Sequence, residues 1–286
     1  MLLSFKMLGA HLVPGSFADY ASLFEAVKLV DVIVCAISGV HMRSHSILLQ
    51  LTLVQAIKEA GNVKRFLPSE FGTDAARGAK AGTEPGKVTF EDKMVVRKAI
   101  EEAGIPFTYV SANCFAGYFV GGFVSLVKSF LPQTPCSYME MATQKSMDQE
   151  LEIYDCMSMF VEIGSKYVAE DDIATYTIKT IDDPRTLNKT LYIRPPLNIL
   201  SQRQVVQKWE KLIGKELHKT TISKQDFLAS MKSLEYAHQV GLCHYHDVLY
   251  EGCLTNFEIG EDGEEASSLY PEVKYTTVEE FLKRYV

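Results

Sequence analysis

The sequence predicts an α/β protein built on a parallel sheet, and two observations support this. Over the first two-fifths of the 286 residues, short apolar runs rich in β-branched residues alternate with amphipathic segments of helical length. Strands separated by helices of this length imply βαβ units, whose strands are parallel. The rest of the chain is mostly helical in pattern, which predicts a smaller second part that packs over the sheet.

The elements of the first part follow in a regular order. The strands are expected at 10–14, 29–37, 63–68 and 106–112, and the helices at 17–29, 45–60 and 89–104. The segment 29–37 is a nearly unbroken β-branched run, typical of a strand buried on both faces. Gly61 and Gly104 suit the ends of the second and third helices.

The second part begins with a stretch, 125–166, that has no clear period and is expected to be irregular. Helices are then expected at 169–181, 201–214, 223–242 and 275–282, with a strand at 190–194. We therefore divide the chain into a nucleotide-binding part, 1–124, and a substrate-binding part, 125–286, of which some returns to the sheet.

Composition excludes several classes of partner. A net charge of -7 argues against nucleic acid, whose phosphates need a basic surface. No signal peptide pattern and no long uncharged apolar stretch is visible, so no membrane partner is expected. The six cysteines show neither CxxC nor zinc-like spacing, which suits buried thiols in a reducing compartment. We expect a cytoplasmic protein without a metal centre, since His244-Tyr-His246-Asp247 alone is weak evidence for one.

Three loops are expected to surround one crevice. In parallel sheets, ligands bind beyond the carboxyl ends of the strands. The residues at such ends are Ser38 and Gly39, the segment 68–72, and the segment 113–115. Topology alone therefore gathers these loops around a candidate site.

The helix at 89–104 carries Lys93 in its expected first turn and Arg97 one turn later. A cation at this end opposes the helix dipole, which lowers the pKa of the amine towards general-base use. Glu91 and Asp92 act in the opposite direction, so the sign of the net shift stays open. A solvated helix face, on which both cations are inert, is the alternative interpretation.

Several expected motifs are absent from the sequence. No GxGxxG or GxxGxxG occurs, and the nearest match, 260–266, carries four acids that would repel a pyrophosphate. Tyr270 and Lys274 have the Tyr-x-x-x-Lys spacing, but Pro271 disfavours a helix there. Serine-hydrolase and zinc-protease motifs are not found.

Several long segments nevertheless resemble one family, the plant isoflavone reductase-like enzymes, an NmrA-like branch of the atypical short-chain dehydrogenases. The segments are 38–45, 63–74, 90–97 and 111–119. Within that branch, 250–260 and 269–273 most resemble the pinoresinol-lariciresinol reductases. The resemblance covers nearly the whole chain apart from 125–166.

This resemblance implies an NADPH-dependent enzyme with a Rossmann-type, NAD(P)-binding sheet and a mostly helical substrate domain, and in the family a homodimer. It implies that Lys93 is catalytic and that His244 contacts a small phenolic substrate. The residues it places along the cofactor are Arg97, Ser38, Gly39, Asn113 and Phe115.

The implied reaction is reduction of a lignan benzylic ether of the pinoresinol and lariciresinol type. Neutral Lys93 would remove a phenol proton, the ether oxygen would be expelled, and hydride from the nicotinamide would add to the quinone methide.

Three departures from the family pattern bear on these expectations. The family's opening strand, its Gly-x-x-Gly-x-x-Gly loop and the basic residues for the NADPH 2′-phosphate would precede Met1. We therefore expect a sheet without its first strands, which leaves backbone groups unpaired at an interior edge and removes a pyrophosphate site. The segment 125–166 is longer than in the family, and His244-Tyr-His246-Asp247 replaces His-Tyr-Tyr-His. The alternative function is a catalytically defective or non-catalytic nucleotide-sensing protein.

Overall fold

The computed structural model describes residues 2–37, 46–121, 156–157, 164–217, 219–220 and 222–286. Its centre is a parallel sheet in the strand order β1-β2-β3-β7-β10. The strands are β1 (Val32–Val34), β2 (Arg65–Leu67), β3 (Thr108–Ser111), β7 (Lys189–Tyr192) and β10 (Gly263–Glu265). A bridge between Phe66 and Phe107 joins β2 to β3, and the other neighbours pair in parallel register. The predicted α/β fold class is confirmed.

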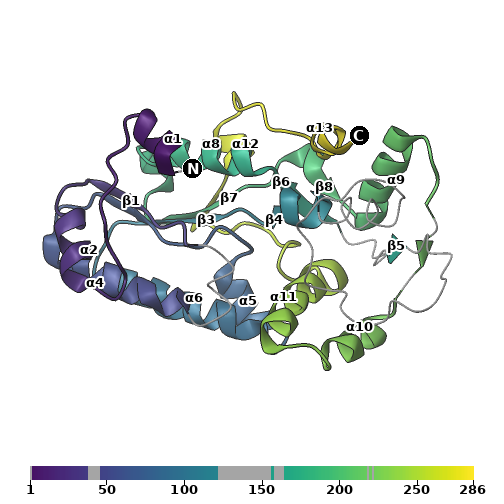
Figure 1. Cartoon of the computed structure of the whole chain (residues 1–286), viewed down its shortest axis with the longest axis horizontal. Coiled ribbons are helices and arrows are strands. Elements are labelled where there is room, and N and C mark those ends of the chain that lie inside the picture. The colour runs from purple at the N-terminus through teal and green to yellow at the C-terminus, as the bar shows by residue number, and fades with distance from the viewer. Residues whose placement is uncertain (1, 38–45, 122–155, 158–163, 218, 221) are drawn as a thin grey trace.

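Helices cover both faces of this sheet (Figure 1). One face carries α2 (Tyr20–Val27), α4 (Gln50–Ala60) and α6 (Lys87–Glu102), and the other carries α8 (Glu170–Thr180) and α12 (Ala266–Leu269). Side chains of a strand alternate between the faces, so Phe66 packs in the core of the first face and Leu67 in that of the second. The central strands β2 and β3 are therefore buried on both faces, as expected for parallel strands, whereas β1, predicted to be buried on both faces, is only partly buried and exposes Val34.

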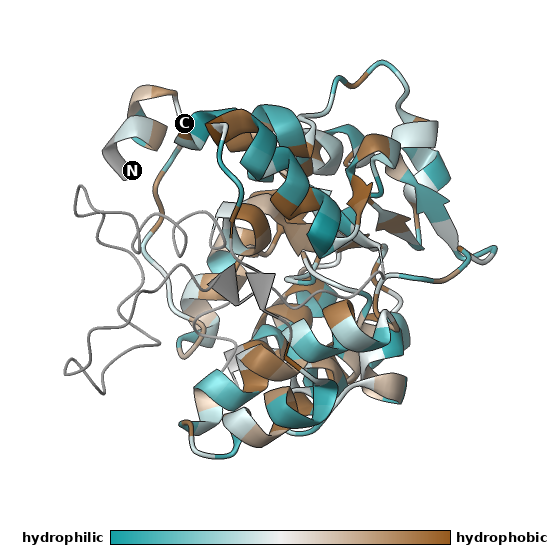
Figure 2. Ribbon diagram, turned by 90° about the vertical axis from the view of Figure 1, so that its right-hand side faces the viewer, coloured by the Kyte–Doolittle hydropathy of each residue, from teal (hydrophilic) through white to brown (hydrophobic). Residues whose placement is uncertain are grey.

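The second half of the chain adds further strands and helices. One small sheet contains β4 (Cys114–Phe115), β6 (Ser165–Val168) and β8 (Ile199–Leu200). A second contains β5 (Cys156–Met157) and β9 (Lys219–Thr220). The helices are α9 (Gln202–Ile213), α10 (Lys224–Met231), α11 (Tyr236–His246), the π-helical turn η5 (Asp247–Glu251) and α13 (Val278–Leu282). These helices carry both hydrophobic and hydrophilic residues (Figure 2). Apolar residues of α9, η5 and α13 gather around Trp209, whereas those of α10 and α11 form a separate cluster with Phe227 and Cys243.

The division of the chain into two parts stays a prediction. Strands β7 and β10 come from the second half and lie in the same sheet as β3, in line with the predicted return to that sheet. Among the described residues β1 pairs with β2 alone, so β1 is one edge of the sheet as the structure describes it. Most of 125–166 lies outside the described residues. Within the described part, none of the helices is both long and apolar enough to cross a bilayer.

Three details of the sequence interpretation are corrected. Residues 10–14 form no strand, and Leu12 and Val13 are exposed, because this segment pairs with no described strand. The predicted helix at 223–242 is two helices, α10 and α11. Helix α6 begins at Lys87, two residues before the predicted start, so Lys93 lies beyond its first turn.

Arg65 connects the sheet to the segment after α8. Its side chain is buried, and Nη1 donates to Thr108 Oγ1 (3.1 Å), to the Thr180 carbonyl (2.7 Å) and to Thr186 Oγ1 (2.8 Å). Its Nη2 donates to the Asp183 carbonyl at 3.0 Å. One buried cation thus satisfies acceptors on β3, at the end of α8 and in the turn that precedes β7.

Candidate active site

Lys93 is the central residue of the candidate site. It lies on the buried face of α6, its residue surface is 6% exposed, and Nζ donates to the Glu70 backbone carbonyl at 2.7 Å. Burial lowers the pKa of the Lys93 amine and Arg97 lowers it further, whereas Glu70 and Asp74 oppose this. The net shift of the Lys93 pKa, whose sign the sequence left open, is downward. The helix dipole argument does not apply, and desolvation is the cause.

Arg97 lies one turn after Lys93 on the same helix and is equally buried. Its Nε and Nη2 donate to the two carboxylate oxygens of Glu70, at 3.0 and 2.7 Å. Its guanidinium also stacks on the Tyr109 ring, 4.3 Å from the centroid. The described contacts of Arg97 are therefore with protein groups, and its predicted contact with the cofactor stays a prediction.

Glu70 and Asp74 are site residues that the sequence analysis missed. Both follow β2, in the loop and at the first turn of α5 (Ala75–Ala81). Asp74 caps α5 through the Arg77 amide, accepts from the Tyr192 hydroxyl at 2.9 Å, and lies 3.9 Å from Arg97 Nη2. Their signal in the sequence was two carboxylates beyond the carboxyl end of a buried strand.

Asn113 and Phe115 follow β3 and reach the same region. The Asn113 amide N–H donates to the Gly72 carbonyl at 3.0 Å, and its Nδ2 donates to the Ile193 carbonyl at 2.9 Å. Its φ of 54° is left-handed, which Asn tolerates better than most residues. Its Oδ1 is buried and has no hydrogen-bond partner among the described residues. Phe115 lies against the core of the second sheet face.

His244 approaches α6 from a different element. It lies near the end of α11, with Nε2 3.1 Å from the Gly86 carbonyl and its ring 4.7 Å from the Phe90 ring. Phe90 lies one turn before Lys93 on α6. The His244 ring therefore packs against α6 about one turn before Lys93. The structure thus gathers Lys93, Arg97 and Asn113 around the segment 70–72 and brings His244 to the start of α6. The predicted residues Ser38 and Gly39 lie outside the described residues.

The end of α11 is fixed to the loop before α6 by a buried carboxylate. Asp247 is fully buried, and it accepts from the Thr83 amide at 2.9 Å and from Thr83 Oγ1. His246 Nδ1 lies 3.1 Å from the same hydroxyl oxygen. His246 and Asp247 therefore make structural contacts, and no group of three or more metal-ligating side chains was found in the described part of the chain.

Replacing Thr83 by valine is expected to lower the free energy of unfolding by about 1–3 kcal/mol, because Asp247 Oδ1 loses the hydroxyl donor and keeps only the contact with His246 Nδ1. Denaturant unfolding measures the change. Thr175→Val is the matched control, since Thr175 is exposed on α8. Equal effects of the two substitutions would show that the Thr83 contact does not hold α11.

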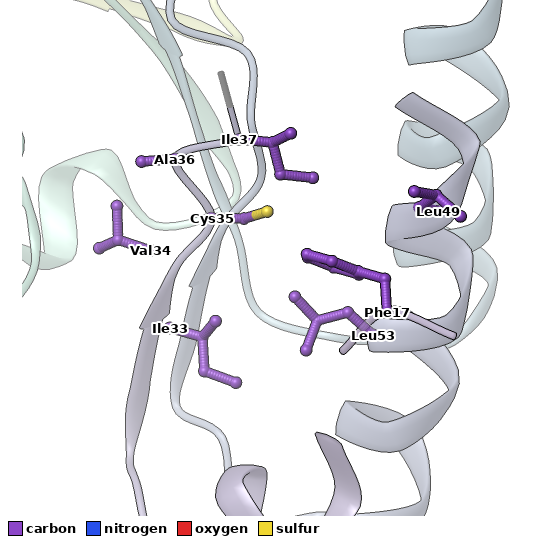
Figure 3. Close-up of a pocket in the computed structure, with 8 residues that line it drawn as sticks. All are labelled: Phe17, Ile33, Val34, Cys35, Ala36, Ile37, Leu49 and Leu53. Carbon is purple, nitrogen blue, oxygen red and sulfur yellow. The ribbon is translucent and has the colours of Figure 1, made fainter. Parts of the chain in front are cut away.

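Two cavities lie beside these elements. One, of about 530 Å³, is lined almost wholly by apolar side chains between the end of β1 and α4. In Figure 3, Cys35, Phe17 and Leu53 point toward one another, whereas Val34 points to the other side of β1. Burial raises the pKa of the Cys35 thiol to about 11, so this thiol is inert. The other cavity, of about 460 Å³, is polar and borders Arg97, Asp74 and Tyr192.

The fold and the buried lysine define a Rossmann-type protein with a candidate proton-transfer site, and comparison with known proteins gives the family. The NmrA-like family model matches residues 1–282. The chain belongs to the NmrA-like family, which confirms the predicted membership.

Individual relatives show which members of the family the chain resembles. The chain is 67% identical to a bifunctional pinoresinol-lariciresinol reductase of Forsythia intermedia, over 100% of this chain and 85% of the relative. A protein of the same description from Linum corymbulosum is 65% identical, with 100% and 84% covered. A solved structure, AtPrR2 with NADP+ and (+)pinoresinol, has 51% identity and a TM-score of 0.83, over 100% of this chain and 85% of that one. Isoflavone reductase is also similar, at 34% identity and a TM-score of 0.81, over 100% and 84%.

Proposed function

We propose that the chain is an NADPH-dependent reductase of benzylic ethers of the pinoresinol and lariciresinol type. Relatives with that activity in their names share 62–67% of its residues over its full length. This is the function that the resemblance of the sequence implied.

The observation that carries the proposal is the environment of Lys93. A lysine acts as a general base only when a useful fraction of its amine is neutral near neutral pH. Burial lowers the pKa of the Lys93 amine and so raises its neutral fraction, and the contact of Nζ with a backbone carbonyl favours the charged form less than an ion pair with a carboxylate would.

The residues after β3 fit the nicotinamide end of NADPH. The orphaned Asn113 Oδ1 is a buried acceptor at the carboxyl end of a central strand, where an amide donor of the nicotinamide would satisfy it. Asn113 and Phe115 would therefore hold this end of the cofactor, which when bound supplies the hydride. The other predicted contacts are Ser38, Gly39 and Arg97.

The chain's own residues manage the proton and the substrate. Neutral Lys93 Nζ takes the proton of the phenol para to the benzylic ether. The phenolate then pushes electron density to the benzylic carbon, and the carbon–oxygen bond of the ether breaks. The released ether oxygen takes a proton from water. The benzylic carbon would accept the hydride that the bound cofactor supplies, and Lys93 then returns its proton to the phenolate, so that one hydride and one proton are added overall. His244, beside Phe90 and Gly86, would orient the substrate.

We propose in addition that the protein works in the cytoplasm as a homodimer, with no nucleic-acid or membrane partner. The four cysteines whose side chains are described are free thiols, three of them buried, which suits a reducing compartment. The homodimer follows from the resemblance to the family, and light scattering on the purified chain tests it.

Incubation of the chain with pinoresinol and NADPH tests the activity. Mass spectrometry is expected to detect lariciresinol as NADPH is consumed, and nicotinamide fluorescence is expected to show saturable NADPH binding. NADPH binding without turnover would favour the non-catalytic nucleotide-sensing alternative. Absence of both binding and product would contradict the proposal.

A further inference from the structure

We infer that Glu70 and Arg97 form a positioning pair that holds Lys93 in place and keeps its amine from pairing with a buried carboxylate. This inference rests on the proposed role of Lys93 as a base. It assigns to Arg97 the role of positioning Lys93, and it assigns the same role to Glu70, for which the sequence predicted no role.

The contacts form a closed ring across two elements. Glu70 offers its backbone carbonyl to Lys93 Nζ at 2.7 Å and its carboxylate to Arg97 Nε and Nη2 at 3.0 and 2.7 Å. Lys93 and Arg97 are four residues apart on α6, so one helix face holds both donors. The planar guanidinium fork fixes the carboxylate in two places. The orientation of the Glu70 backbone, and with it the acceptor for Lys93, is fixed by the same residue's side chain.

The loop that carries Glu70 is held on both sides of this residue. The Ser69 amide donates to Gln50 Oε1 at 2.8 Å, and the Gly72 carbonyl accepts from the Asn113 amide at 3.0 Å. Phe71 has a φ of 32°, which is unfavourable for a residue with a Cβ. Such a conformation persists only where surrounding contacts impose it. The buried ion pair between Glu70 and Arg97 lies next to Phe71 in the chain and helps to impose this conformation.

The pair also sets the electrostatic balance at Lys93. The charged groups that act on its amine are Glu70 and Asp74, from the loop after β2 and the start of α5, and Arg97 from its own helix. Glu70 without Arg97 would be a buried carboxylate beside the amine, which favours the ammonium. Arg97 without Glu70 would be a buried cation beside it, which favours the neutral amine. Removal of either partner therefore moves the protonation of Lys93 in opposite directions.

The test compares the pH dependence of kcat/KM in Arg97→Gln and Glu70→Gln. The acidic limb of Arg97→Gln is expected to move to higher pH, and that of Glu70→Gln to lower pH, each by about one to three units. Arg97→Lys is expected to keep the limb of the wild type with a lower kcat, because it keeps the charge but loses the fork. The double variant removes both charges of the pair, and Asp74 keeps its hydrogen bonds from Tyr192 and the Arg77 amide, so it is expected to fold and to have an intermediate acidic limb.

Lys87 and Glu91 provide the matched control. They form an i, i+4 pair on the same helix, in which Glu91 is exposed and Lys87 half-buried, with Nζ and Oε1 3.4 Å apart. Lys87→Gln and Glu91→Gln are expected to leave the pH limb unchanged. The inference would be overturned if Arg97→Gln and Glu70→Gln lost stability but kept the acidic limb of the kcat/KM profile at its wild-type pH. Weaker NADPH binding by Arg97→Gln with an unmoved limb would also overturn it, since Arg97 would then be a cofactor contact.

A titration without turnover separates this inference from the proposed function. Lysine labelled with ¹³C at Cε reports the charge of its amine by NMR, and the Lys93 signal is assigned by its loss in Lys93→Met. Opposite displacements of the Lys93 titration in the two variants would support the positioning pair even if no benzylic ether is reduced. A Lys93 titration that is the same in both variants and the wild type would overturn it whatever the activity.

Discussion

Lys93→Met is expected to lower kcat by about 10²–10⁴-fold, the contribution of a positioned general base. Methionine fills a similar volume, so the substitution removes the amine without a large cavity. The buried surroundings of Lys93 then lose a group that is costly to desolvate, whereas the Glu70 carbonyl loses its donor, so the two effects on stability oppose each other. NADPH binding is expected to be unchanged. Turnover is measured with pinoresinol, and binding by nicotinamide fluorescence.

Lys98→Met is the control for this change. Lys98 lies on the same helix, but its side chain is 74% exposed and pairs with Glu102. This substitution is expected to leave kcat unchanged, because the charge is screened by water. An equal loss in Lys98→Met, or full activity in Lys93→Met, would remove Lys93 from the mechanism.

Arg65→Met is expected to lower the free energy of unfolding by about 2–4 kcal/mol, the second large effect. The change removes one donor from each of the acceptors on Thr108, Thr180, Thr186 and Asp183, and each lost hydrogen bond has a cost. The acceptors on Thr180, Thr186 and Asp183 keep other donors. Urea unfolding followed by circular dichroism measures it.

Lys64→Met is the neighbouring control for Arg65→Met. The Lys64 side chain is 75% exposed and its contact with Asp31 is 3.5 Å, so little stability is expected to be lost. A midpoint for Arg65→Met equal to that of Lys64→Met would show that the Arg65 hydrogen bonds contribute nothing net.

The sequence predicted the parallel sheet well because its signal is local. The strands at 32–34, 65–67 and 108–111 all fall inside predicted apolar runs. The strands at 65–67 and 108–111 are buried on both faces and need such runs. The strand predicted at 10–14 failed for the opposite reason. This segment does contain apolar residues, but a strand forms only where a neighbouring strand offers backbone groups for pairing.

The sequence named candidate site residues but not the contacts that surround them. Lys93 was such a candidate, yet its environment depends on Glu70, which is 23 residues away in the chain. The ion pair between Glu70 and Arg97 spans 27 residues, and no periodicity reports such a contact. The start of α6 at Lys87 further moved Lys93 away from the end of the helix dipole. Desolvation arises from tertiary packing, which a local pattern does not contain.

Trp209 is the single tryptophan of the chain and is 1% exposed in the apolar cluster with Phe281 and Leu282. Its fluorescence emission is therefore a natural optical reporter for the cluster that joins α9 to the C-terminal helix. Far-ultraviolet circular dichroism, in contrast, averages over every helix. Comparison of the two signals during denaturation would show whether this cluster melts together with the parallel sheet or separately from it.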